Sequence, residues 1–281
     1  MIKLIVNADD LGIDKGINRG IELSHREGIV TSTSIIAGGD FFDDALQIIK
    51  NNPELDTGLH FTLVLSKPVS EPSKVSSLLK DGKVFRDYWY NFYYALLRNK
   101  INKDEIAFEL ESQINKLLDN DITISHINSH LHLHLLPGVI ESVLLIAKKY
   151  SIRWIRVPEE PFSFRLNSKQ LIAQKIKYGL YKIVTFKSNS KIKKFGLNYP
   201  DRSFGLTDTG CMSESALISC LKRLKPDINE ILVHPGISNG RKIIMGINNY
   251  KWDIEIKALT SEKVKEYISS NSIKLTNYNS I

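Results

Sequence analysis

The chain has 281 residues, enough to bury a large core, and α/β barrels of about 250 residues are ordinary single domains. Its apolar fraction (42%) and charged fraction (25%) are typical of a globular protein, and no apolar run approaches the roughly 20 residues that span a bilayer. The net charge of +7 does not favour a nucleic-acid-binding protein, because lysine is abundant throughout and the excess lies mainly in residues 165–194.

The cysteine content and the first residues indicate a cytoplasmic protein. Cys211 and Cys220 provide neither a disulfide framework nor the spacing of a zinc knuckle. Met1 leads almost directly into an apolar run, which leaves no room for a signal peptide. We therefore expect two reduced thiols.

Strand and helix patterns alternate along the whole chain. Strands are predicted at residues 2–6, 30–36, 55–63, 122–128, 152–157, 230–233 and 273–275. Helices are predicted at residues 13–28, 45–49, 102–117, 137–149, 172–183, 213–224 and 261–269. This alternation predicts a parallel sheet, and seven or eight strand–helix units favour a TIM-barrel-like fold that is incomplete or distorted.

The predicted barrel forms a single catalytic domain over residues 1–281. Residues 159–200 are the least regular part, and we interpret them as an insertion that could cover the active site or support a homodimer. Residues 85–94 contain seven aromatic side chains. They could line a sugar-binding wall, since a flat ring stacks well on a pyranose, or they could simply pack a helix on the core.

Polar residues able to carry chemistry follow the ends of several predicted strands. They are Asp9, Asp10, His60, His130, Arg156 and His234. In a barrel all parallel strands end on the same rim, which is where barrel enzymes place their active sites. Imidazole and carboxylate are ligands of divalent metals, so these segments are predicted to converge on one metal site.

Four of the seven histidines lie within residues 125–134. His130, His132 and His134 alternate, so an extended segment could present all three on one face and bind metal by itself. The preferred interpretation ends the strand near His130, with the neighbours, including Asn128, orienting the ligands through hydrogen bonds.

The remaining candidates have separate predicted roles. Asp9 and Asp10 point in opposite directions on an extended chain, so one could bind metal while the other faces the substrate, or either could cap the next helix. His234 precedes Pro235 and could protonate a leaving amine. Arg156 could bind an anionic group or orient a carboxylate.

The motifs together resemble the YdjC-like carbohydrate deacetylases, the group that contains chitooligosaccharide deacetylase. The resemblance depends on residues 7–12 (NADDLG), 28–33 (GIVTST), 58–61 (GLHF), 129–134 (SHLHLH) and 233–236 (VHPG). The motifs occur in the family's order, from the first strand to the last quarter of the chain.

The resemblance implies a barrel-like α/β fold, one divalent metal ion such as magnesium or zinc, and an N-acetylated sugar substrate. By position, it implies metal ligation by Asp10, His60 and His130. It also places Asp9 as the general base and His234 as the catalytic acid. Asn128 departs from the family, which often has aspartate there, so a role that needs charge is in doubt while a hydrogen-bonding role survives.

The expected reaction is hydrolysis of the acetamide, with Asp9 accepting a proton from water and His234 protonating the amine. Other readings use the same residues differently. Two histidines and a carboxylate also form the iron site of non-haem oxygenases, and a phosphoesterase could use the same barrel site. A basic binding module with structural histidines would instead bind polyanions without metal.

Overall fold

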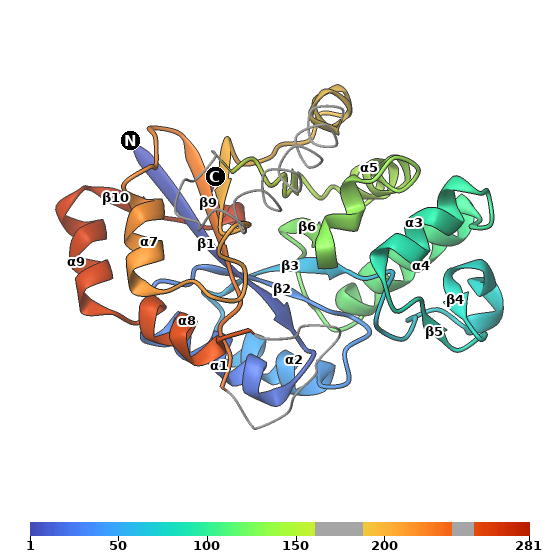
Figure 1. Cartoon of the computed structure of the whole chain (residues 1–281), viewed down its shortest axis with the longest axis horizontal. Helices are drawn as coiled ribbons and strands as arrows, with labels where there is room; N and C mark the ends of the chain where they lie inside the picture. The colour runs from blue at the N-terminus through green and yellow to red at the C-terminus, as the bar shows by residue number, and fades with distance from the viewer. Residues whose placement is uncertain (161–187, 238–249) are drawn as a thin grey trace, which may run out of the picture.

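The computed structural model describes residues 1–160, 188–237 and 250–281 and contains a row of parallel strands (Figure 1). In spatial order the row is β7 (Trp154–Ile155), β6 (His126–Ser129), β3 (Asp56–Phe61), β2 (Ser32–Ile35), β1 (Ile2–Leu11), β9 (Ile228–Val233) and β8 (Arg202–Phe204). β10 (Ile273–Leu275) pairs in parallel with the first residues of β1. β1 therefore pairs with three strands, β2, β9 and β10.

The two ends of the row approach each other and nearly close a barrel. Trp154 of β7 forms an isolated parallel bridge with Asn198, which precedes β8. Farther along, the Ser203 side chain donates a hydrogen bond to the Val157 carbonyl oxygen (2.9 Å). This seam is irregular and lacks a continuous ladder. The prediction of an incomplete, TIM-barrel-like (β/α) fold is confirmed.

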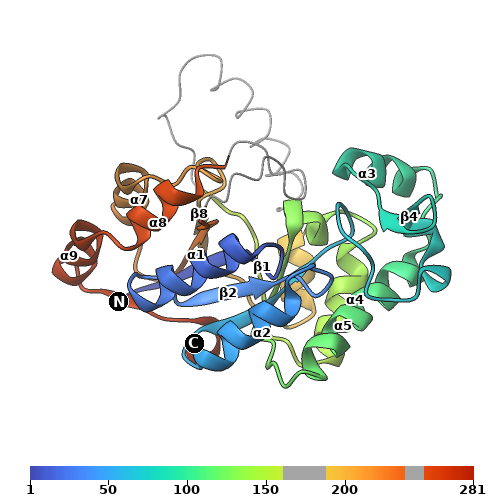
Figure 2. The same ribbon diagram turned by 90° about the horizontal axis from the view of Figure 1, so that it is seen from below.

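Helices cover the outside of the strand row (Figures 1 and 2). They are α1 (Lys15–Arg26), α2 (Phe42–Asn51), α4 (Lys103–Leu118), α5 (Ile140–Lys149), α7 (Glu214–Leu221), α8 (Trp252–Leu259) and α9 (Glu262–Ser270). One further helix, α3 (Trp89–Leu97), lies beyond the end of β3 (Figure 1). α9, α7, α8, α1 and α2 pack in that order, and α4 packs with α5. Of the residues described, no helix is long and apolar enough to cross a membrane.

Alternate residues of β1 separate an apolar core from a polar interior. Leu4, Val6 and Ala8 join the main apolar cluster beneath the helices. Ile5 instead packs with Trp154 and Tyr278, and the side chains of the next alternating positions, Asn7 and Asp9, are joined by a hydrogen bond. Successive side chains of a strand point to opposite faces, so Asn7 and Asp9 share the inner face with Ile5.

The C-terminal 3-10 turn η4 (Tyr278–Ser280) packs against the strands near their first residues. The ring of Tyr278 stacks on His126 with centroids 4.0 Å apart. Asp56, the first residue of β3, accepts hydrogen bonds from the Tyr278 backbone N (3.2 Å) and from Asn279 Nδ2 (2.6 Å). The end of the chain therefore supports the barrel from the side opposite the carboxyl ends of the strands.

Several predicted boundaries were wrong for identifiable reasons. β1 continues to Leu11, past the predicted end at residue 6, because the polar residues Asn7, Asp9 and Asp10 are buried within the strand. β8 and α8 had no predicted counterpart. The predicted helix at residues 172–183 and most of the predicted insertion at 159–200 lie outside the described residues.

The predicted helix at residues 102–117 begins at Asn102, which is followed three residues later by Glu105, the pattern of a capping box. The Asn102 side chain accepts a hydrogen bond from the Asp104 backbone N (2.9 Å) and caps the helix. The Glu105 carboxylate, which a capping box would direct back to Asn102, instead accepts hydrogen bonds from the backbone and hydroxyl of Ser77 (both 2.8 Å). Glu105 thus ties α4 to the preceding loop.

We predict that Gly20→Ala destabilises the fold, because α1 lies directly against the loop after β9. A Cβ atom at Gly20 would lie 2.4 Å from Gly236 Cα and 2.9 Å from the Pro235 carbonyl carbon. Overpacking of this kind costs about 1–3 kcal/mol. Urea denaturation should show the loss in the free energy of unfolding. The control Ser269→Ala, at an exposed position of α9, should stay within about 0.5 kcal/mol. A Gly20→Ala protein as stable as the parent would contradict the packing.

Candidate metal centre and catalytic residues

Asp10, His60 and His130 come together at the carboxyl ends of β1, β3 and β6. Each offers a ligand atom, and these atoms all lie within 4.8 Å of one another. Asp10 Oδ1 is 3.3 Å from His60 Nε2 and 3.4 Å from His130 Nδ1. All three side chains are buried. The cluster thus has the composition and size of a divalent metal site.

The backbone of β1 directs Asp9 and Asp10 to different neighbours. Asp10 has a left-handed backbone (φ 71°), and the pairing of β1 with β2 shifts register between Ala8 and Leu11. Such a conformation is rare for residues other than glycine and commonly occurs where a side chain must be re-aimed. Asp10 consequently faces the two histidines, while Asp9 stays in the barrel interior.

The atoms of the cluster fit a bound cation. Asp10 Oδ1 and His60 Nε2 are buried and have no hydrogen-bond partner within the described part of the chain. The buried carboxylates of Asp9 and Glu230 share the buried guanidinium of Arg156, whereas the buried carboxylate of Asp10 lies beside two imidazoles. Buried charges require compensation, so a divalent cation beside Asp10 would balance this group.

Asp9 is held by four hydrogen-bonding neighbours. Its Oδ1 accepts from Asn7 Nδ2 (2.8 Å), Ser34 Oγ (2.9 Å) and Asn128 Nδ2 (3.1 Å). Its Oδ2 accepts from Arg156 Nη1. Burial alone would raise the pKa of Asp9, but Arg156 and the nearby histidines outweigh it and hold the pKa below the ordinary value. Asp9 is therefore a fixed, ionised carboxylate at neutral pH.

Arg156 bridges Asp9 and Glu230 inside the barrel. Its side chain is completely buried, and its Nε donates to Glu230 Oε1 (2.7 Å). Burial lowers the pKa of the guanidinium, but the two carboxylates raise it above its usual range. Of the two predicted roles, the geometry supports orientation of a carboxylate, because Arg156 is completely buried and donates to the carboxylates of both Asp9 and Glu230.

His234 follows β9 and faces Asp9 from the opposite side of the site. Its Nε2 lies 3.9 Å from Asp9 Oδ2, and its ring packs edge-on against Tyr250 at 5.1 Å between centroids. The His234 backbone N donates to Glu255 Oε2 (2.5 Å), which anchors the loop to α8. An imidazole nitrogen therefore lies within 3.9 Å of an ionised carboxylate oxygen.

Asn128 connects the metal cluster to Asp9. Its Oδ1 lies 2.7 Å from His60 Nδ1, so His60 is held with Nε2 toward Asp10. Its Nδ2 donates to Asp9 and to Ser34 Oγ (both 3.1 Å). A carboxylate at this position could not donate to Asp9 unless it were protonated. The hydrogen-bonding role expected for Asn128 is therefore the one that the geometry supports.

The extended His-x-His-x-His arrangement is wrong. The strand ends at Ser129, and His130–Leu135 form the 3-10 turn η3, with left-handed backbone at Leu131 and His132. His132 is half-buried outside the cluster. His134 is fully buried, with Nδ1 2.6 Å from Ser129 Oγ and Nε2 2.8 Å from the Arg156 carbonyl oxygen. Of the three histidines, only His130 reaches the cluster.

We predict that His134 makes stability depend on pH. Burial lowers its pKa to about 3, whereas an unfolded histidine titrates near about 6.5. As pH falls below about 6.5, the unfolded chain binds a proton that the folded chain does not, so stability is lost. The parent should therefore lose about 2 kcal/mol more unfolding free energy than His134→Gln when the pH is lowered from 7.5 to 5. A difference that is constant over this range would contradict a neutral, buried His134.

Three residues of this site were missed by the sequence analysis, namely Asn7, Ser34 and Glu230. Each is a polar residue that is buried within a strand. Buried polar groups require hydrogen-bond partners, so their positions carried a usable signal of a polar barrel interior.

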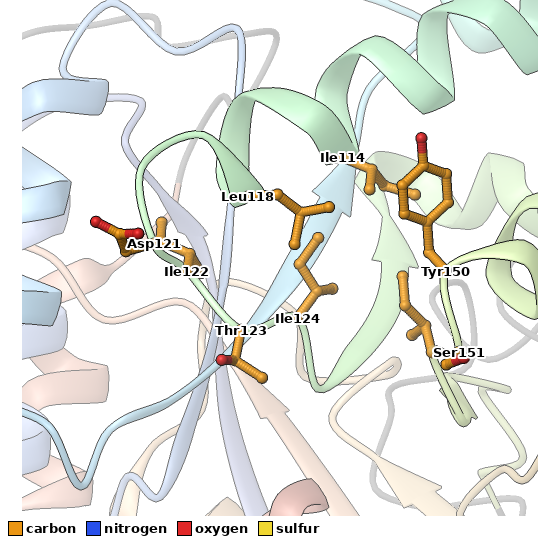
Figure 3. Close-up of a pocket in the computed structure, with 9 residues that line it drawn as sticks. Ile114, Leu118, Asp121, Ile122, Thr123, Ile124, Tyr150 and Ser151 are labelled. Carbon is orange, nitrogen blue, oxygen red and sulfur yellow. The ribbon is translucent and has the colours of Figure 1, made fainter.

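A separate cavity lies far from this chemistry at the opposite ends of the strands (Figure 3). It has a volume of about 440 Å³, and residues 121–124, which line it, precede β6. Residues of α4 and the end of α5, including Ile114 and Tyr150, complete its wall. In barrels this end serves stability, so the cavity is no candidate for the active site.

The fold and the site together define the chain as a barrel protein with a buried carboxylate–imidazole cluster that could hold a metal ion. The pattern of the YdjC-like protein family matches residues 3–270. The chain belongs to this family.

Individual relatives agree with this assignment. A carbohydrate deacetylase of Thermoanaerobacter pseudethanolicus is 31% identical over 98% of this chain and 97% of its own. A chitooligosaccharide deacetylase of Salmonella heidelberg is 38% identical over 53% of this chain and 57% of its own. A crystal structure from Enterococcus faecalis, described as a candidate cellobiose-phosphate cleavage protein, has 25% identity and a TM-score of 0.75 over 99% of this chain and 98% of its own.

Proposed function

We propose that this protein is a metal-dependent deacetylase that removes the acetyl group from an N-acetylated amino sugar or oligosaccharide. The observation that carries the proposal is the match of nearly the whole chain to a relative named carbohydrate deacetylase. The Asp10, His60 and His130 cluster, with Asp9 and His234 beside it, supplies the groups that amide hydrolysis needs.

Asp10, His60 and His130 are the proposed metal ligands. Two imidazole donors favour zinc or a related transition metal over magnesium, which prefers oxygen ligands. When bound, the ion would supply a Lewis acid that polarises the acetamide carbonyl and lowers the pKa of water.

Asp9 and His234 are the proposed general base and general acid. Asp9, held by Arg156 and by three neutral donors, accepts a proton as the water oxygen adds to the acetamide carbon. His234, whose Nε2 lies 3.9 Å from Asp9 Oδ2, donates a proton to the nitrogen as the carbon–nitrogen bond breaks. The products are acetate and a free amino sugar.

The test is acetate release from N-acetylglucosamine and its oligomers, with chelated protein and with protein reloaded with zinc, magnesium or manganese. We expect release only after reloading. Bound metal without acetate release from any N-acetylated sugar would remove the deacetylase assignment and leave the metal centre.

A phosphoesterase on the same barrel is the second candidate, because a carboxylate–imidazole metal site also serves phosphoester hydrolysis and the name of the similar Enterococcus faecalis structure mentions a sugar phosphate. Parallel assays of phosphate release from phosphorylated disaccharides separate the two. Phosphate release in preference to acetate release would favour this alternative.

A cytoplasmic location is also part of the proposal. Both cysteines lie in the described residues, and neither Cys211 nor Cys220 is in a disulfide, as expected for a reducing compartment.

A further inference from the structure

The connection between β3 and α4 forms a small unit that follows the strand carrying His60. It contains β4 (Leu79–Lys80), β5 (Val84–Phe85) and α3. β3 ends immediately after His60, so this connection leaves the sheet at the carboxyl edge, and the unit lies beyond the end of β3 (Figure 1). Loops at this edge form the substrate site in barrel enzymes.

Two contacts fix this unit to the segments that carry His60 and His130. Leu65 lies four residues after β3, and its backbone N donates to the Arg86 carbonyl oxygen (3.1 Å). A Cβ atom at Gly138 would lie 3.2 Å from the Leu96 side chain, so α3 packs on the loop that follows η3. The unit is therefore attached to the rim of the site on two sides.

α3 buries one face and exposes aromatic rings on the other. Phe92, Ala95 and Leu96 are buried. The exposed fractions are 54% for Tyr88, 45% for Trp89, 51% for Tyr90 and 55% for Tyr94. Large aromatic groups that stay exposed together mark an interaction surface. Packing of α3 on the core therefore explains why some aromatic residues occur in residues 85–94, but not the four that stay exposed.

A polar pocket of about 350 Å³ adjoins this aromatic face. Its lining residues are Lys80, Arg86, Asp87, Asn91, Tyr94, Ala95 and Lys100. The pocket thus combines one aromatic ring with carboxylate, amide and guanidinium groups. Arg86 Nε is buried and has no hydrogen-bond partner in the described ranges, so one donor beside the pocket is unused. The volume lies within the ~300–1,000 Å³ of small-molecule sites.

We infer that this pocket and the exposed rings of α3 form a subsite for sugar units of an oligosaccharide that lie beyond the unit losing its acetyl group. The inference rests on the proposed deacetylase function and narrows its substrate to oligosaccharides. Ring faces pack on the apolar faces of sugars, and planar polar side chains bind their hydroxyl groups.

A second copy of the chain is a poorer occupant of this surface. Three cations and one carboxylate line the pocket. In a symmetric dimer the same patch would face itself, and the excess positive charge would repel. A neutral oligosaccharide avoids this cost.

The test compares kinetics with substrates of different length. In Tyr94→Ala and Asn91→Ala proteins, the KM for an N-acetylglucosamine hexasaccharide should rise about ten-fold relative to the KM for the disaccharide, with little change in kcat. The control Leu97→Ala changes an exposed residue of the same helix that does not line the pocket, and it should keep the parent ratio. An unchanged ratio in Tyr94→Ala and Asn91→Ala would overturn the subsite.

A binding measurement separates this inference from the proposed function. Trp89 is exposed, whereas Trp154 and Trp252 are buried, so quenching of tryptophan fluorescence by hexasaccharide in metal-free protein reports on α3. Binding that Tyr94→Ala weakens would support the subsite even if no acetate were released. Absence of binding in the parent protein, or a sedimentation mass of a dimer that Tyr94→Ala converts to a monomer, would overturn it.

Discussion

Replacing His130 with alanine is expected to remove bound metal and to reduce acetate release to background. His130 Nδ1 lies 3.4 Å from Asp10 Oδ1 and is one of three buried ligand atoms in the cluster. Loss of a neighbour that only orients a ligand typically weakens metal binding by about 10–100-fold. Loss of a ligand itself should exceed about 100-fold, measured as metal content after dialysis against a zinc buffer.

His132→Ala is the matched control for that experiment. His132 lies two residues away, on the same 3-10 turn, but it does not belong to the cluster. This protein should retain one metal ion per chain. If His130→Ala retained its metal while His132→Ala lost it, the proposed ligand set would be wrong and the turn would have to present a different histidine.

The Asp9→Asn protein is expected to keep its metal and lose activity by about 10²–10⁴-fold, the usual contribution of a general base. Asparagine has nearly the same shape and can still occupy the space between Arg156, Ser34 and Asn128. It cannot accept a proton from water at neutral pH. The measurement is kcat for acetate release, alongside metal content and unfolding free energy.

Glu230→Gln is the informative comparison for Asp9→Asn. It changes the other carboxylate bound to Arg156 but leaves Asp9 intact. A base at Asp9 predicts a much smaller loss of kcat for Glu230→Gln than for Asp9→Asn. Full turnover by Asp9→Asn would defeat the assignment of the base, and equal losses would indicate that only the buried charge balance matters.

The fold could be predicted from the sequence where the pattern of apolar residues is simple. The last strand, residues 273–275, was predicted with its observed limits, and Asn102 and Ser213 correctly marked the starts of α4 and α7. β8 was missed because three residues bounded by irregular chain carry too little periodicity. Its strand character comes from pairing with β9.

The candidate site was predictable to the extent that strand ends meet on one rim. This argument brought residues from β1, β3, β6 and β9 together correctly. It could not predict how Asp9 and Asp10 diverge, because that depends on the left-handed backbone at Asp10 and on a local register shift. Nor could it predict Glu230, whose role depends on which interior side chain Arg156 reaches.

The pairing of β1 has a consequence for how the protein folds. The first strand of the chain pairs with two of the last, with Lys3 opposite Ile228 and Ile2 opposite Ile273. Contacts between such distant parts of a chain slow folding, because the entropy of closing a long loop is lost before the contacts can stabilise the chain. During synthesis β1 must wait for β9 and β10 to emerge. Until β9 has been synthesised, Glu230 is absent and Arg156 has only Asp9 as a carboxylate partner. The arrangement of side chains that holds Asp9 can therefore form only once the strand row is complete.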